Sequence, residues 1–128
     1  MTTPPVQVLP PRLVIASLPP DAAIPPLDPA AFSLLIRDEA ETTVVLEEGA
    51  WGVLAGRYAA PRAEGGYRAL RLVQDFPLDT VGVMAAAAGR LAGAGVPLMA
   101  YSTFRTDVLL VRERDLDQAL AALDGASF

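Results

Sequence analysis

Residues 75–111 have the sequence DFPLDTVGVMAAAAGRLAGAGVPLMAYSTFRTDVLLV, and this stretch carries most of the information about the fold. Apolar residues recur in it at steps of three and four from Leu78 to Ala94, around a run of alanines with high helix propensity. The pattern predicts a helix over Leu78–Ala94. Its ends are expected at residues that cap helices well, which are Asp79 or Thr80 at the start and Gly93 or Gly95 at the end.

The segments around this helix predict strands and a second helix. Tyr67–Asp75 alternates apolar and polar residues before the helix, and Val96–Phe104 and Val108–Val111 follow it as two apolar runs. Such patterns, with a polar turn between the two runs, predict a strand and then a β-hairpin. A last helix is expected to begin near Asp115, because the spacing of this residue to Gln118 fits a capping box.

The beginning of the chain is rich in proline. Nine of the twelve prolines lie in the first 29 residues, so this segment is expected to be extended with turns. Arg12–Leu18 is its one expected strand. Pro19–Pro29 is a connection along which Ile24, Leu27 and, just beyond it, Phe32 are spaced as if anchored on a core. We therefore expect an ordered loop rather than a disordered linker.

The residues that follow predict a hairpin and a short helix. Phe32–Arg37 and Thr42–Glu47 are rich in β-favouring residues and are joined by an acidic stretch, which predicts a hairpin with a solvated tip. Glu48–Leu54 is a short helix candidate. Gly56–Gly66 contains glycines and a proline and is predicted to be a loop.

The same order of elements occurs twice. A strand, a connection, a hairpin and a helix are expected in residues 12–54 and again in 67–123. We interpret this as two related βαββα-type units, residues 1–62 and 63–128, of which the first is degenerate because a proline-rich loop replaces the long helix. Chance similarity is the alternative, since hairpin-plus-helix units are common. The expected fold class is α+β, with antiparallel sheet covered by helices on one face.

The composition favours binding over catalysis. Cys, His, Lys and Asn are absent, and all ten basic residues are Arg. There is thus no thiolate nucleophile, no imidazole base, no zinc site of the usual kind and no Schiff-base lysine. The net charge of -5 repels phosphate backbones and anionic lipid, so nucleic acid is not expected as a partner. We expect no cofactor and no catalytic residues.

Membrane insertion and secretion are not expected either. The densest apolar run, residues 81–100, is broken by glycines, Arg90 and Pro97, and it lacks the length of about 18 uninterrupted apolar residues that a span needs. The N-terminus has no positive region before an apolar segment, so it does not have the pattern of a signal peptide. We expect a cytoplasmic protein.

A family resemblance extends over nearly the whole chain. The stretch quoted above, followed by RERDLDQALAAL at 112–123, resembles the C-terminal unit of small tandem ACT-domain proteins of the CASTOR-like type, whose relatives are amino-acid sensors. VLPPRLVIASLPPDAAIP at 8–25 and FSLLIRDEAETTVVL at 32–46 resemble the N-terminal unit. The most specific part is a set of residues in the hairpin and the strand-to-helix turn: Ser102, Thr103, Phe104, Thr106, Asp107, Leu78 and Gly82. Val108 departs from the family, which more usually has an aromatic residue there.

The resemblance implies a fold and a function. It implies two ferredoxin-like ACT units that bind a small molecule, most often an amino acid, where the first strand turns into the first helix at the interface with a neighbouring unit. It also implies that any activity belongs to a separate regulated protein.

The strand-to-helix turn is the first candidate site. Backbone amides around Thr80, Val81 and Gly82, after Leu78, can point outward and hold a ligand carboxylate with the help of the helix dipole. Gly82 permits close backbone approach. The alternative is that Gly82 lets the helix pack tightly on the sheet.

The second hairpin is the other candidate site. Ser102 and Thr103 lie where an apolar strand turns polar, and their hydroxyls can donate to or accept from an amino acid. Asp107 can pair with an α-amino or guanidinium group. The alternatives are that the hydroxyls only form a turn and that Asp107 forms an Asx-type hairpin turn. Arg105 could close over an anion or face water.

A metal site at the acidic residues is not expected. Hard cations take oxygen ligands, and these residues supply carboxylates: Asp38, Glu39 and Glu41, or Glu47 and Glu48. The chain has no DxDxDG loop, however, and an acidic hairpin tip commonly protects an edge strand from pairing.

Two hypotheses for function follow. The first is a regulatory or sensor domain that binds an amino acid at the unit interface and has no catalytic activity of its own. The second is a structural or protein-interaction module that forms homodimers and binds no ligand. A homodimer fits both hypotheses. A carboxylate-based hydrolase is a remote third alternative, because it rests on the acidic residue count alone.

Overall fold

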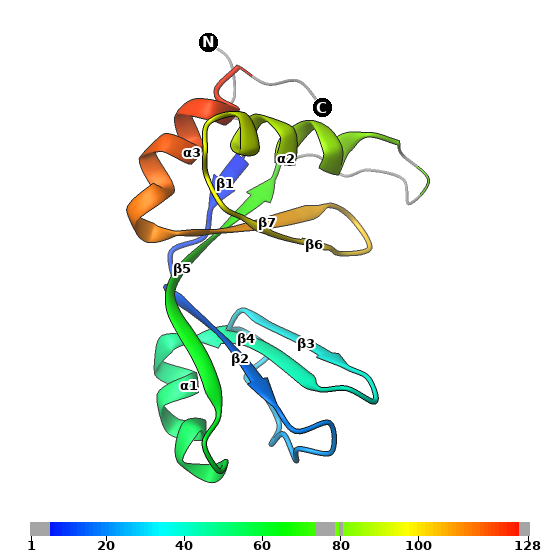
Figure 1. Ribbon diagram of the computed structural model, residues 1–128, viewed down its shortest axis with the longest axis vertical. Coiled ribbons are helices and arrows are strands. Elements are labelled where there is room, and N and C mark those ends of the chain that lie inside the picture. The colour runs from blue at the N-terminus through cyan, green and yellow to red at the C-terminus, as the bar shows by residue number, and fades with distance from the viewer. Residues whose placement is uncertain (1–5, 74–78, 80, 126–128) are drawn as a thin grey trace. The chain divides into compact units, whose positions relative to one another are not determined.

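The computed structural model describes residues 6–73, 79 and 81–125, which form two compact units (Figure 1). The N-terminal unit is Pro11–Tyr67, and the C-terminal unit combines Met1–Pro10 with Arg68–Phe128. The sequence led us to expect a division into residues 1–62 and 63–128. The observed units differ because the first ten residues belong with the C-terminal unit and the boundary lies within a strand.

The N-terminal unit contains the strands that its sequence predicts. These are β2 (Leu13–Leu18), β3 (Ser33–Arg37) and β4 (Thr42–Glu47), together with the first part of β5 (Arg62–Leu72). The order is β3-β4-β2-β5, and each of these pairings is antiparallel. The predicted first hairpin is thus confirmed as β3 and β4.

One face of this sheet is covered by a helix and by the proline-rich connection. Helix α1 (Glu48–Leu54) has the predicted bounds and is followed by a 3₁₀ turn, Ala55–Arg57. Residues of the connection pack on the core that α1 shares with β2 and β4, and among them are Ile24 and Leu27. The Tyr58 hydroxyl donates to the Ala23 carbonyl at 2.9 Å. The expected ordered loop is therefore confirmed.

The predicted loop Gly56–Gly66 is wrong for its second half. Arg62 is the first residue of β5, and Gly65 and Gly66 lie inside this strand. The register against β2 shifts between Leu13↔Tyr67 and Ile15↔Glu64, so β5 has one more residue there than its partner. Gly66 has a φ of 76°. The glycines mark a β-bulge rather than a turn.

The C-terminal unit contains four strands in its described part. β7 (Asp107–Arg112) lies between β6 (Met99–Ser102) and the second part of β5. β1 (Val6–Val8) pairs antiparallel with β5, with Gln7 opposite Arg71. Strand β1 was not expected from the sequence, because three residues among prolines are too short for a periodic signal. Within this unit, β1 is the fourth strand of a βαββα arrangement.

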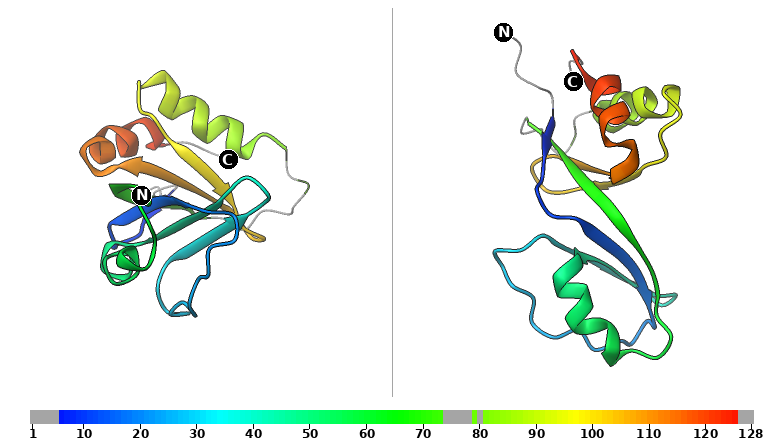
Figure 2. Two further views of the ribbon diagram at one scale, coloured as in Figure 1. Left: turned by 60° about the horizontal axis from the view of Figure 1, so that its bottom comes forward. Right: turned by 90° about the vertical axis from the view of Figure 1, so that its left-hand side faces the viewer.

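Two helices lie on one face of this sheet (Figures 1 and 2). These are α2 (Val83–Gly93) and α3 (Leu116–Leu123), and they share a core with β1, β5 and β7. The largest side chains that are fully buried in this core are Leu70, Leu72, Leu91, Leu109, Leu123 and Val111.

The start of α2 differs from the prediction, whereas its end agrees. The helix begins at Val83, and its N-cap is Gly82 with a φ of 88° rather than Asp79. Thr80 and Leu78 lie outside the described residues. At the other end, Gly95 has a φ of 75°, its N–H donates to Ala92, and Val96 N–H donates to Leu91. This is a Schellman motif, as expected for a terminal glycine.

The predicted capping box at α3 is wrong. A 3₁₀ turn, Glu113–Asp115, precedes the helix, and Asp115 makes no side-chain capping bond. Gln118 instead donates from Nε2 to the Ala94 carbonyl at 2.6 Å. Arg90 donates to the Ala122 carbonyl at 3.1 Å. Both side chains tie α2 to α3 and satisfy carbonyls near helix ends.

The fold class is confirmed as α+β and ferredoxin-like, with antiparallel pairing and helices packed on sheet. In the N-terminal unit no helix lies between β2 and β3, where the proline-rich connection runs. Among the described helices, none has the length and hydropathy to cross a membrane.

The bulge in β5 generates a stability prediction. Gly66→Ala adds a Cβ to a residue with a φ of 76°, so we expect a loss of about 1 kcal/mol in the free energy of unfolding, measured by urea titration. The control is Gly52→Ala in α1, where a Cβ meets nothing within 4 Å. This change is expected to stabilise by about 0.5–1 kcal/mol. Equal effects of the two substitutions would contradict the bulge.

Candidate functional site

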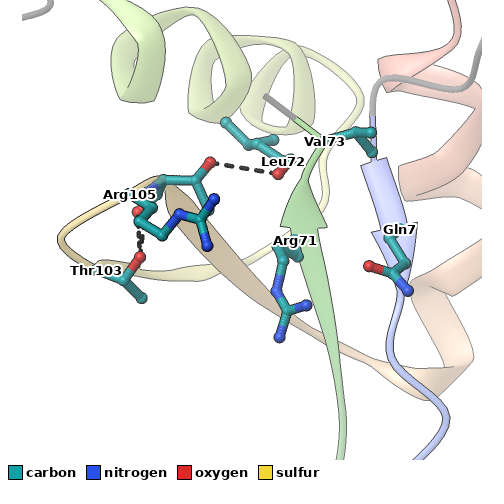
Figure 3. A pocket seen from close by; sticks show the side chains of 7 residues that line it. Gln7, Arg71, Leu72, Val73, Thr103 and Arg105 are labelled. Atoms are coloured by element: carbon teal, nitrogen blue, oxygen red, sulfur yellow. Dashed lines mark hydrogen bonds between the residues drawn. The ribbon is translucent and has the colours of Figure 1, made fainter. Parts of the chain in front are cut away.

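A hollow of about 490 Å³ lies within the C-terminal unit (Figure 3). Its described lining comes from β1, from the end of β5 and from the turn between β6 and β7. The lining residues are Gln7, Arg71, Leu72, Val73, Thr103, Arg105 and Thr106. The hollow is therefore built from three segments that are far apart in the sequence.

Strand pairing fixes two of the polar side chains at the hollow. Gln7 and Arg71 are direct partners in the β1–β5 register. They alternate with Val6, Leu70 and Leu72, whose side chains belong to the core under the helices. Since successive side chains of a strand point to opposite faces, Gln7 and Arg71 project from the face away from α2 and α3.

Hydrogen bonds hold the β6–β7 turn in one geometry. Thr103 N–H donates to the Thr106 carbonyl at 2.8 Å, and Thr103 Oγ1 donates to the same carbonyl at 3.0 Å. Thr106 N–H donates to Thr103 Oγ1 at 3.1 Å. Thr106 Oγ1 donates to the Leu72 carbonyl at 3.3 Å, as the dashed line in Figure 3 marks. The last bond fastens the turn to β5 and orders the residues at the hollow.

The described lining of the hollow carries positive charge. Among its described lining residues are two arginines and no carboxylate, although the chain as a whole has a net charge of -5. An arginine keeps its charge at every physiological pH and offers a planar set of donors that fits a carboxylate or phosphate. Figure 3 shows the Arg71, Arg105 and Gln7 side chains around the same space. The arrangement can bind a small molecule that carries an anionic group.

The predicted hairpin residues Ser102, Thr103 and Asp107 do not all lie at the hollow. Ser102 Oγ donates to Asp107 Oδ1 at 2.7 Å, and the two residues are direct partners across β6 and β7. Asp107 alternates with Val108 and shares the face of Leu109, which lies in the core under the helices. Of the predicted site residues that the structure describes, only Thr103 lines the hollow. The Asx-type turn considered for Asp107 is not found, because the Thr103 hydroxyl closes the turn.

The predicted strand-to-helix turn is described only in part. Val81 is 94% exposed, and Gly82 is exposed too. Leu78 and Thr80 lie outside the described residues. A Cβ on Gly82 would meet nothing within 4 Å, so close packing of the helix on the sheet does not require this glycine. Its φ of 88° does. That alternative for Gly82 is therefore wrong.

Most of the residues at the hollow were missed by the sequence analysis. Gln7, Arg71, Leu72 and Val73 were not singled out, and Arg105 was considered only as a residue of the hairpin tip. A weak signal existed, because Val6, Gln7 and Val8 alternate, as do Leu70, Arg71 and Leu72. Alternation places the middle residue of each triplet on the face opposite its neighbours. Nothing in the sequence indicated that the two triplets pair.

The acidic hairpin tip forms a turn. Asp38 Oδ1 accepts from the backbone N–H groups of Ala40 at 2.8 Å and Glu41 at 3.0 Å. Glu41 accepts from the hydroxyls of Thr43 and Ser17, both at 2.8 Å. Within the described part of the chain, no cluster of three or more metal-ligating side chains is found. The carboxylates of the tip are used for local hydrogen bonds.

These bonds generate a pH prediction. The backbone N–H of Glu41, and then that of Ala40, lower the pKa of Asp38 below its usual value. Because the pKa of Asp38 is lower in the folded state, ionised Asp38 stabilises the turn at pH values above its unfolded pKa. This stabilisation is lost as the pH falls through the folded pKa. We expect NMR titration to give a lower midpoint for Asp38 in the protein than in a peptide of residues 36–43. Equal midpoints would contradict the turn.

Comparison with known protein families finds a match for the C-terminal part of the chain. Residues 62–124 match the family model described as ACT domain. No curated protein matches the chain. The match runs from the first residue of β5 to the end of α3, and it includes most of the lining of the hollow.

Several solved structures share the fold. Protein Atu0741 of Agrobacterium tumefaciens is 26% identical with a TM-score of 0.75, over 92% of this chain and 84% of that one. Protein VC0802 of Vibrio cholerae, described as of unknown function and a possible transport protein, is 20% identical with a TM-score of 0.71, over 95% and 88%. The ligand-free regulatory subunit of aspartate kinase from Thermus thermophilus is 13% identical with a TM-score of 0.58, over 88% and 90%.

These findings support an ACT-domain protein. The neighbours match both units rather than the C-terminal one alone, which agrees with the ferredoxin-like arrangement of each. The ACT match supports a non-catalytic domain with a small-molecule-binding regulatory role.

Proposed function

We propose that the protein is a ligand-sensing regulatory domain that binds an amino acid in the hollow of the C-terminal unit. It performs no reaction of its own and acts on a separate regulated protein. The observation that carries this proposal is the hollow itself, because donors and acceptors from β1, β5 and the β6–β7 turn converge there.

The size and the chemistry of the hollow suit an amino acid. Its volume of about 490 Å³ lies in the range of small-molecule sites, about 300–1,000 Å³. Arg71 and Arg105 offer paired donors for carboxylate groups, the α-carboxylate among them. The Gln7 side-chain carbonyl and the Thr103 and Thr106 hydroxyl oxygens offer acceptors for the α-ammonium group. Both ends of an amino acid thus have complementary groups.

The same residues support a role without catalysis. Neither arginine can serve as a general base, because guanidinium groups do not lose their proton in proteins. The Thr103 and Thr106 hydroxyls already donate to backbone carbonyls. The sequence has no His, Cys or Lys that could activate them. These groups favour reversible binding.

We further propose that the protein is cytoplasmic and homodimeric and resembles the CASTOR-like sensors in both units. Strand β3 of the N-terminal unit supports self-association, because it is last in the strand order and has two exposed apolar residues. Leu35 is 42% and Ile36 is 47% exposed. Pairing of two copies along β3 without a ligand is the alternative function.

A thermal unfolding screen tests the amino-acid proposal. The full chain, ligand-free by native mass spectrometry, is melted with each of the twenty amino acids at millimolar concentration. A ligand at 100 times its Kd is expected to add about 2.7 kcal/mol to the free energy of unfolding. We expect one or a few amino acids to raise the Tm, and Gln7→Ala to reduce that rise. Asp107→Ala is expected to leave it in place, since Asp107 shares the face of the helices.

Two outcomes would contradict this proposal. Loss of the Tm rise in Asp107→Ala, with Gln7→Ala unaffected, would move the site to the helix side of the sheet. A flat screen would favour the interaction module.

A further inference from the structure

We propose that the hollow selects ligands with two anionic groups and that Arg71 sets this selectivity. This inference rests on the proposed function and deepens it, since it names acidic amino acids as the ligand class. The shared chemistry is a compact dianion, so non-amino dicarboxylates and inorganic phosphate are other possible sources of the same groups.

Three other arginines of the chain have partners within the fold. Arg68 donates to the Leu9 carbonyl at 3.1 Å and pairs with Glu113 at 3.4 Å. Arg37 donates to the Ala22 carbonyl at 2.6 Å, and Arg90 to a carbonyl at the end of α3. These guanidinium groups join segments of the fold.

Arg71 is different. Within the described part of the chain, its guanidinium has no hydrogen-bond or ion-pair partner. Its backbone is fixed in the middle of the β1–β5 ladder, between the buried Leu70 and Leu72. Arg71 therefore has an ordered backbone and a guanidinium group that joins no segments of the described fold, so this group is available to bind a ligand.

The residues around Arg71 in the hollow carry further positive charge. Arg105 supplies a second fixed positive charge at the same hollow, and no carboxylate is among the described lining residues. Gln7, directly opposite Arg71, is neutral and offers both a donor and an acceptor. A ligand with one net negative charge gains from this field, whereas one with a net positive charge is repelled. The hollow therefore discriminates by ligand charge.

The test compares ligands of nearly equal shape. Isothermal titration calorimetry on the full chain measures L-aspartate against L-asparagine, and succinate and inorganic phosphate separately. We expect aspartate to bind about ten- to a hundredfold tighter than asparagine, which is the range for a hydrogen bond to a charged group. Arg71→Gln is expected to remove this preference. Arg71→Lys keeps the charge without the planar donors and should retain part of it.

The matched control is Arg114→Gln. Arg114 is an exposed arginine of the same unit and does not line the hollow, and its replacement changes the net charge by the same amount. The aspartate preference should stay within about twofold in this variant. Circular dichroism and the Tm check that Arg71→Gln folds, and Arg105→Gln is a second variant at the hollow that should also weaken aspartate binding.

The outcomes separate this inference from the proposed function. Binding of a neutral or basic amino acid with no preference for aspartate, or a preference that Arg71→Gln leaves unchanged, overturns the anion selectivity and keeps the sensor. Binding of succinate or phosphate with no amino acid keeps the anion site and overturns the amino-acid proposal. The absence of any binding overturns both.

Discussion

The fold depends on strand β5, which contributes to both units. Its first part pairs with β2 in the N-terminal unit, and its second part pairs with β1 and β7 in the C-terminal unit. In chain order, β5 is therefore the last strand of the N-terminal unit and also the first strand of the βαββα arrangement in the C-terminal unit. Among the described residues, the C-terminal unit has only three strands from 68–125, and β1 from the start of the chain is its fourth. This exchange brings Gln7 opposite Arg71.

The sequence was sufficient for the elements that have strong local signals. Strands β2, β3 and β4 and helix α1 lie where alternation and propensity placed them, and the Schellman motif after α2 follows from Gly95. The errors arose where pairing overrides a local signal. Two glycines that indicate a loop became a bulge in β5, because β2 offered a complete edge of backbone donors and acceptors. Gln118 met a carbonyl of α2 instead of capping its own helix.

The candidate site illustrates the same limit. Thr103 was predicted because it follows an apolar strand, which is a local feature, and it lines the hollow. Gln7 and Arg71 are 64 positions apart and come together only through the β1–β5 register, which no local pattern specifies. Ser102 and Asp107 were both predicted as ligand-binding residues, but they bond to each other, and strand alternation assigns Asp107 to the helix face. Predicting a site made by strand exchange requires the topology first.

The most direct test of the central claim is a two-dimensional ¹H–¹⁵N NMR titration of the full chain with the amino acid that raises the Tm most. If the hollow binds the ligand, the largest shift changes will occur at the backbone amides of its lining, namely Gln7, Arg71, Thr103, Arg105 and Thr106. Changes confined to Val81, Gly82, Ser102 and Asp107, or none at millimolar ligand, would contradict the account.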